Sequence, residues 1–303
     1  MKLNKIIFTT FVLNIIIVNI HLTYAQVWSS VGGGVKNGHI ISLHTFNNTL
    51  YLGGGFDSVG NMPAKGTASW NGNQWEALGT GIYGEVRAIT NFNSDLYAAG
   101  SFSAAGGVLA NCIARWDNIN WSPLGNGVPH QVNALKVYNN ELYVGGWFRR
   151  TGNIETNFIA KWNSTGWIVF PNTLNNPVHV FEEYNGELYI GGSFDSIGLQ
   201  PSKYLVRLSG NSWIPSENHF NGYIEAMAVY NNELYVGGRF TKIDTLQVNH
   251  IARWNGTEWN EVGNGINRSQ TQSTAVLALS VFNNELYVGD FLIPSAQYNQ
   301  KIL

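Results

Sequence analysis

One position in this chain recurs every 46 residues from 41 to 225 and once more at 277, and four of its six occurrences carry a different polar side chain. The residue before it is always Val or Ile, whereas the position itself changes from repeat to repeat. Its polar members are Arg87, Asn133, His179 and Glu225, and the first and last repeats carry Ile41 and Leu277. A guanidinium, a carboxamide, an imidazole and a carboxylate that converge on one axis can hydrogen-bond a polar ligand. We therefore predict that this register binds a ligand.

Aromatic and imidazole side chains stand close to the same register. Tyr83, His130 and Tyr223 each precede one of its members by a few residues. A tyrosine ring offers a flat apolar face on which a sugar can stack, together with a polar hydroxyl. We include these three residues in the predicted binding site and expect a glycan or a protein as the ligand. The alternative is that these side chains only line a water-filled channel.

No residue pattern predicts catalytic or metal chemistry. Cys112 is the only cysteine, and the histidines show neither H-x-H nor H-E-x-x-H spacing. Glu182 and Glu183 are adjacent, and adjacent residues on a strand point to opposite faces, so their carboxylates cannot flank one glycosidic bond. We predict no catalytic residue, no metal and no cofactor. A hydrolase or lyase that acts on polysaccharide remains the alternative.

The elements that position these residues are internal repeats. A Leu-Tyr pair begins at 50, 96, 142, 188, 234 and 286, and two tryptophan positions follow nearly the same period. Each repeat reads as four strands, for example 132–138 and 141–146, joined by an Asn-Asn turn. Four-stranded units of this length are typical of β-propeller blades, in which we expect glycines and tryptophans to meet between neighbouring blades. A stacked β-solenoid is the alternative.

The repeats predict an all-β fold with six four-stranded blades. Their approximate ranges are 36–82, 83–128, 129–174, 175–221, 222–266 and 267–303. Residues 26–35 resemble a fourth strand, so we expect them to close the last blade as its outermost strand, with Ile302 equivalent to Ile251. The competing interpretation is a truncated, open chain.

The first 25 residues have the features of a signal peptide. Lys2 and Lys5 precede an apolar run that ends at a small residue, Ala25. Of the 17 basic side chains these two lie in the leader, which leaves 15 against 19 acidic ones and no basic stripe for nucleic acid. We expect a single domain at 26–303, monomeric and secreted or at the cell surface, with no membrane span after cleavage.

The repeated phrase resembles a known family of repeats. "LYVGGRF" and "HIARWNGTEWNEVGNGI", residues 234–240 and 250–266, are similar to the repeats of secreted bacterial β-propeller proteins. These repeats are allied to delta-60-type repeats and cortical polarity marker proteins, and more distantly to kelch and galactose oxidase propellers. The resemblance covers nearly all of 26–303 and implies the fold, whereas most members have no assigned chemistry.

The pattern of loops indicates where binding occurs. Short turns join the first strand to the second and the third to the fourth, so they share one face of the ring. The longer loops and the starts of the inner strands share the opposite face, around the channel. We expect a secreted, non-enzymatic interaction or ligand-binding module that uses this second face. A purely structural surface protein is a further alternative.

Overall fold

The computed structural model describes residues 31–210, 212–266, 275–290 and 300–302, and regular structure in these ranges is all β-strand. The chain divides into residues 1–31 and 32–303, and only the second unit is considered below. The predicted signal peptide, residues 1–25, lies outside the described residues. In the described part of the chain, no helix is long and apolar enough to cross a membrane.

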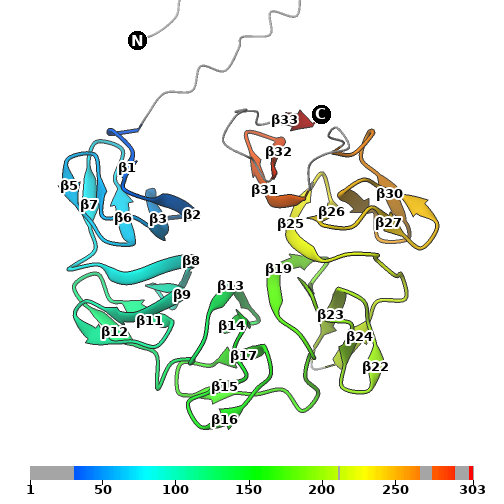
Figure 1. The fold of residues 1–303 in the computed structure, drawn as a ribbon, viewed down its shortest axis with the longest axis horizontal. Coiled ribbons are helices and arrows are strands. Elements are labelled where there is room, and N and C mark those ends of the chain that lie inside the picture. The colour runs from blue at the N-terminus through cyan, green and yellow to red at the C-terminus, as the bar shows by residue number, and fades with distance from the viewer. Residues whose placement is uncertain (1–30, 211, 267–274, 291–299, 303) are drawn as a thin grey trace, which may run out of the picture. The chain divides into compact units, whose positions relative to one another are not determined.

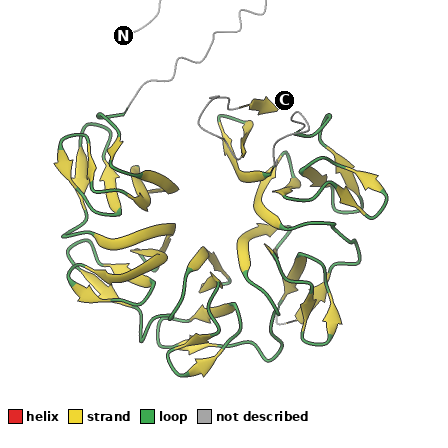
Figure 2. Ribbon diagram, viewed as in Figure 1, coloured by secondary structure: helices red, strands yellow, loops and turns green. Residues whose placement is uncertain are grey.

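The described residues within 32–303 form a β-propeller, in which antiparallel sheets follow one another around a common centre (Figures 1 and 2). We number these sheets blade one to blade six in chain order. Their strand orders are β2-β3-β6-β7, β8-β9-β11-β12, β13-β14-β17-β18, β19-β20-β23-β24, β25-β26-β29-β30 and, in its described residues, β31-β32-β33. The innermost strands of consecutive blades contact one another from β2 to β31.

Equivalent strands recur at equivalent places in the repeat. The innermost strands are β2 (His39–Phe46), β8 (Ile82–Phe92), β13 (Val132–Tyr138), β19 (Val178–Tyr184), β25 (Ile224–Tyr230) and β31 (Val276–Phe282). The second strands are β3 (Thr49–Gly55), β9 (Asp95–Ala105), β14 (Glu141–Gly146), β20 (Glu187–Gly192), β26 (Glu233–Gly238) and β32 (Glu285–Asp290). The third strands are β6 (Thr67–Trp70), β11 (Ile113–Trp116), β17 (Ile159–Trp162), β23 (Leu205–Ser209), β29 (Ile251–Trp254) and β33 (Gln300–Ile302).

The outer strands are short, and most loops between second and third strands carry small hairpins. The fourth strands are β7 (Trp75–Ala77), β12 (Trp121–Pro123), β18 (Trp167–Ile168), β24 (Ser212–Pro215) and β30 (Trp259–Glu261). The small strands are β4 (Ser58–Val59), β5 (Met62–Pro63), β10 (Val108–Leu109), β15 (Arg150–Thr151), β16 (Ile154–Glu155), β21 (Ser196–Ile197), β22 (Gln200–Pro201), β27 (Lys242–Ile243) and β28 (Leu246–Gln247). The order of strands places these loops and the linkers between blades at one end of the sheets, which we call the loop face.

Asparagine forms the turns between first and second strands, as the sequence predicted. Asn139 and Asn140 have φ of 48° and 58°, and Asn231 and Asn232 have nearly the same values. A two-residue turn with positive φ at both positions matches the twist of the strands it joins, and asparagine tolerates this conformation better than most residues. The turn therefore fixes the register of each inner hairpin.

The Gly-Gly pair that ends the second strand is required by close packing on both sides. A Cβ on Gly191 would lie 2.5 Å from Cγ2 of Ile224, which belongs to the next blade. A Cβ on Gly192 would instead collide with the backbone carbonyl of Pro177 in its own blade. The predicted contact between neighbouring sheets is thus made by the first glycine, whereas the second allows the inner hairpin to close.

The tryptophans that we expected between neighbouring blades are buried to different depths. Trp121 is buried between blades one and two and donates a hydrogen bond from Nε1 to the Leu78 carbonyl at 2.9 Å. Trp75, Trp213 and Trp259 are only half buried. All four side chains lie on fourth strands, at the rim of the propeller, and only Trp121 of the four is buried there.

Two details of the predicted closure are wrong. Val35 does not extend a last-blade strand but pairs with Val59, as part of β1 (Val35–Lys36), because here the chain already crosses into blade one. Ile302 pairs with Leu286, whereas in blade five the equivalent Leu234 pairs with Trp254. Ile302 is therefore equivalent to Trp254 and not to Ile251, because fewer residues separate the second and third strands in the last blade. Residues 26–30 lie outside the described residues, so closure by an N-terminal strand stays a prediction.

Candidate functional site

The predicted register has a structural cause, which is a β-bulge in every innermost strand. The pairing of β13 with β14 shifts between Val132 and Ala134, so Asn133 is the extra residue. The same shift occurs in the other blades around their equivalent residues, namely Ile41, Arg87, His179, Glu225 and Leu277. A bulge leaves one residue outside the ladder and re-aims its side chain. This explains why the position accepts polar, charged and apolar side chains while the residue before it is always Val or Ile.

The structure brings two predicted site residues, His179 and Glu225, into direct contact across blades four and five. His179 Nδ1 lies 2.8 Å from Glu225 Oε2, and Arg239 Nε donates to Oε1 of the same carboxylate at 2.7 Å. Burial alone would raise the pKa of Glu225, but His179 and Arg239 outweigh it and hold the pKa below its ordinary value. The ring of Tyr223 stands edge-on to His179, with centroids 6.4 Å apart.

We expect the Glu225 carboxylate to make the free energy of unfolding depend on pH in the acidic range. A group whose pKa is lower in the folded state contributes stability above its unfolded pKa, near 4.5, and loses it as pH falls through the folded value. Glu225→Gln should therefore lower the free energy of unfolding at pH 7 and reduce its decline below pH ~4.5. Urea unfolding at several pH values measures both effects. The exposed Glu258→Gln is the control, and equal pH profiles for wild type and Glu225→Gln would contradict the assignment.

Asn133 and Arg87 are also engaged by neighbouring groups. Asn133 donates from Nδ2 to the Val178 carbonyl of the next blade at 2.8 Å. The guanidinium of Arg87 is paired with Glu85, whose other carboxylate oxygen lies 3.2 Å from His39 Nε2 of blade one. The bulge register thus joins consecutive blades, and its four polar residues are not brought together at one point.

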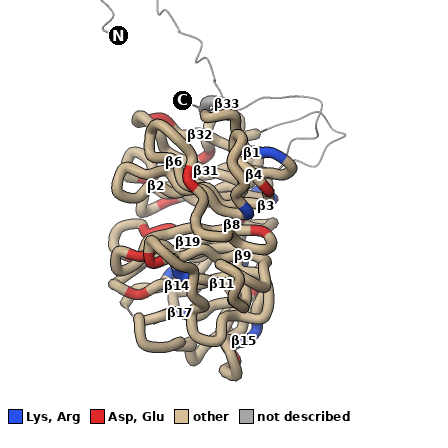
Figure 3. The backbone as a smooth tube through the Cα atoms, turned by 90° about the vertical axis from the view of Figure 1, so that its left-hand side faces the viewer, with Lys and Arg blue, Asp and Glu red and all other residues tan. Residues whose placement is uncertain are grey.

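Tyr83 and His130 belong to a different feature, an open groove on the loop face at blades two and three. Its volume is about 1070 Å³, and its other lining residues include Trp147, Arg149 and Arg150. Tyr83, His130 and Trp147 are all exposed, and Figure 3 shows basic residues in blue beside β15. We call this feature the Trp147 groove. None of the four polar bulge residues is among the residues that line it.

Trp147, Arg149 and Arg150 were missed, although the repeat contains a signal for them. Trp147 stands between the Gly-Gly pair and a buried phenylalanine, and the equivalent residues of other blades are Gly55, Ser101, Ser193 and Arg239. This second register varies as freely as the bulge. The backbone N–H of Trp147 donates to the Gln131 carbonyl at 2.8 Å, which fixes its place on the loop face.

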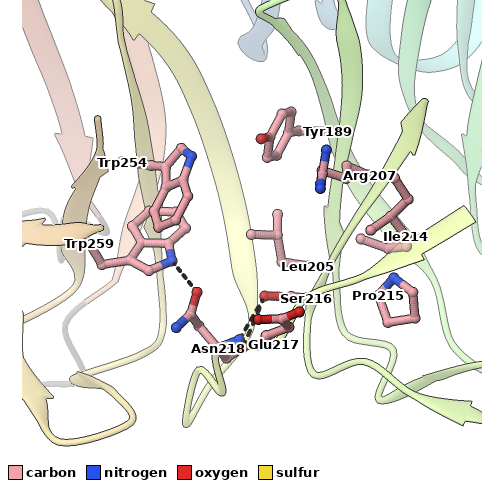
Figure 4. A pocket seen from close by; sticks show the side chains of 11 residues that line it. Tyr189, Leu205, Arg207, Ile214, Pro215, Ser216, Glu217, Asn218, Trp254 and Trp259 are labelled. Atoms are coloured by element: carbon pink, nitrogen blue, oxygen red, sulfur yellow. Dashed lines mark hydrogen bonds between the residues drawn. The ribbon is translucent and has the colours of Figure 1, made fainter. Parts of the chain in front are cut away.

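A smaller crevice of about 190 Å³ lies between blades four and five (Figure 4). Trp254 and Trp259 form one wall, and Arg207 and Pro215 are on the other. An equivalent crevice between blades two and three is lined by the matching residues Tyr97, Arg115, Pro123 and Trp162. Because the feature repeats with the blades and its cation is paired with Glu187, we attribute it to the architecture.

The other groups considered for chemistry, Cys112, Glu182 and Glu183, have surroundings that suit a role in packing or at the surface. Cys112 is buried, and burial raises the pKa of its thiol, which suits packing better than nucleophilic chemistry. Glu182 is bonded by Lys136 at 2.6 Å, whereas Glu183 is exposed, so the two carboxylates do point apart. Within the described part of the chain, no three His, Cys, Asp or Glu side chains gather as a metal site would need.

Comparisons with known proteins support the fold alone. No family model and no curated protein match the chain. Among solved structures it is similar to the extracellular domain of a B. thetaiotaomicron protein named as a one-component system, with TM-score 0.54 and 11% identity over 84% of this chain. The chain spans only 31% of that structure's length.

Two further solved structures match this chain over most of their own length. The computationally designed Ika8 protein has TM-score 0.50 and 14% identity, and the match covers 85% of this chain and 70% of the design. The WD40 β-propeller domain of Doa1 has TM-score 0.41 and 10% identity, with 84% and 91% covered. At these identities the matches carry no information about ligands.

Proposed function

We propose that this protein is an extracytoplasmic, non-enzymatic binding module whose ligand, a glycan or a protein, is held on the loop face. The observation that carries the proposal is the Trp147 groove, an open hollow of about 1070 Å³ with exposed rings and cations at its wall. Tryptophan and arginine dominate binding energy where they occur on recognition surfaces. The secreted β-propeller repeats that the sequence resembles, and the extracellular domain that matches in structure, support this location.

The groove can be tested with one substitution and one matched control. The purified protein is screened on a glycan array and used to capture proteins from extracellular extracts. Trp147→Ala should weaken any captured ligand at least tenfold and leave the unfolding curve nearly unchanged, because the indole is 54% exposed. Ile119→Ala removes an apolar side chain that is even more exposed, at 74%, in a turn on the opposite face, and should change nothing. Ligands that ignore both substitutions would place binding elsewhere.

The enzymatic alternative is favoured by one observation, the contact of His179 with Glu225 beside Tyr223. An acid–base mechanism needs at least two titratable groups in one place, and these residues meet that condition. Arg239, however, already occupies the other carboxylate oxygen. Incubation with polysaccharides, followed by measurement of reducing ends and unsaturated products, tests whether the protein is a hydrolase or a lyase. Products that disappear with His179→Ala would establish the enzyme.

A further inference from the structure

The arginines of this chain divide into two groups. In the described ranges, five of them pair with a carboxylate of their own or a neighbouring strand. These are Arg87, Arg115, Arg207, Arg239 and Arg253. The other two described arginines, Arg149 and Arg150, are adjacent, exposed and without an ion pair. Two neighbouring cations that form no ion pair can bind an anionic ligand.

The surroundings of these two arginines add to the local positive charge. The described residues that line the Trp147 groove contain no Asp or Glu. Lys65 stands with its Nζ 4.8 Å from the centroid of the Tyr83 ring, on the side of blade one. The nearest carboxylate by strand pairing is Glu155, which is opposite Arg150 in the β15–β16 hairpin and makes no ion pair in the described structure. Glu155 is not among the residues that line the groove, so an acidic ligand would meet no carboxylate on the groove wall itself.

Arg149 is held in place before any ligand arrives. Its guanidinium stacks over the Phe158 ring at 5.5 Å, and Phe158 is buried. Its backbone carbonyl accepts hydrogen bonds from the N–H groups of Thr156 and Asn157 at 3.0 and 3.4 Å. Less conformational entropy is lost on binding when the binding group is already positioned.

Trp147 supplies a platform beside the cations. Other blades have glycine, serine or arginine at its register, so the blade does not need an indole there. The ring is 54% exposed, and Tyr83 across the groove is 47% exposed. Flat exposed rings suit the apolar face of a pyranose, and Ser101, Ser103 and Gln131, which also line the groove, can bond hydroxyl groups. Few aliphatic side chains line the groove, which disfavours the apolar anchors of a peptide.

We infer that the Trp147 groove binds an acidic saccharide, with a sugar ring on Trp147 and a sugar carboxylate on Arg149 and Arg150. The inference rests on the proposed function and names its ligand class. A guanidinium group can hold a carboxylate through two parallel hydrogen bonds. This contact is stronger than a hydrogen bond between a guanidinium group and a neutral hydroxyl. Binding should accordingly weaken as ionic strength rises.

The test compares a uronate polymer with its uncharged counterpart. Affinity is measured by calorimetry for oligogalacturonate and for the same oligomer as its methyl ester, after a screen that also includes alginate, hyaluronan and glucuronoxylan. Arg149→Gln and Arg150→Gln should each weaken the acid form at least tenfold and leave the ester unaffected. Trp147→Ala should weaken both forms. Lys203→Ala removes an exposed cation on blade four and serves as the control.

The outcomes separate this inference from the proposed function. Equal affinity for acid and ester, or no binding of any uronate polymer, overturns the acidic saccharide. If a neutral glycan or a protein then binds in a manner that depends on Trp147, the proposed function stands with another ligand. If no ligand depends on Trp147, both proposals fail.

Discussion

Gly191→Val should destabilise the propeller by about 3 kcal/mol, and Gly191→Ala by about 1 kcal/mol. The first atom of any side chain at this position would lie 2.5 Å from Ile224 Cγ2 of the next blade and 3.0 Å from Val180 Cγ1. Cores packed to crystal-like density accept an added methyl group only by displacing rotamers or backbone. Blade two shows that one methyl group is tolerated, because Ala99 occupies the same place in the core with Val132.

Urea unfolding measures this gradation, with Gly166 as the matched control. A Cβ on Gly166 meets nothing within 4 Å, so Gly166→Ala and Gly166→Val should shift the free energy of unfolding by only a few tenths of a kcal/mol. If Gly191→Val is as stable as the wild type, the neighbouring blades do not pack as the structure has them. The increase in destabilisation from Gly191→Ala to Gly191→Val matters more than either value, because it depends on the space between the two neighbouring sheets.

The sequence predicted the blades well because their determinants are local and repeated. The strands expected at 132–138 and 141–146 coincide with β13 and β14, and the turn between them has the expected positive φ. Alternation of side chains and asparagine turns act over a few residues, so they can be read without tertiary structure. Because the same pattern occurs in every repeat, a deviation in a single blade does not obscure it.

The site was harder to predict because it depends on contacts between blades. The bulge register was identified as variable, yet the sequence could not show that Glu225 binds His179 and Arg239 from different strands. The bulge itself has a signal, since the apolar alternation of 132–138 is broken where Ala134 and Leu135 stand next to each other. Trp147 was missed because it follows the glycine pair, in a segment regarded only as a loop.

Substitution of Leu43 should show whether the chain closes into a ring. Ile40 and Leu43 on β2 are 42% and 63% exposed, whereas the equivalent Val86 and Ile89 on β8 are buried against the preceding blade. In every later blade the residue equivalent to Ile40 is buried, and the residue equivalent to Leu43 is buried or half buried. We propose that blade six covers β2 in the same way, with Gly289 opposite Ile40 as Gly237 is opposite Val276.

If blade six covers β2, Leu43→Asp should cost about 3 kcal/mol or more, because burial of the leucine is worth roughly 1.5–3 kcal/mol and the new carboxylate would have to be desolvated. On an open surface the same change costs at most about 0.5 kcal/mol, as expected for the control Leu199→Asp in an exposed loop. A double variant, Ile40→Cys with Gly289→Cys, provides an independent readout. Closure brings the two Cβ atoms within the roughly 4 Å that a disulfide requires, so the monomer should oxidise to a faster-migrating cross-linked form. An unchanged unfolding free energy together with no intramolecular cross-link would show that blade six does not cover this face of β2.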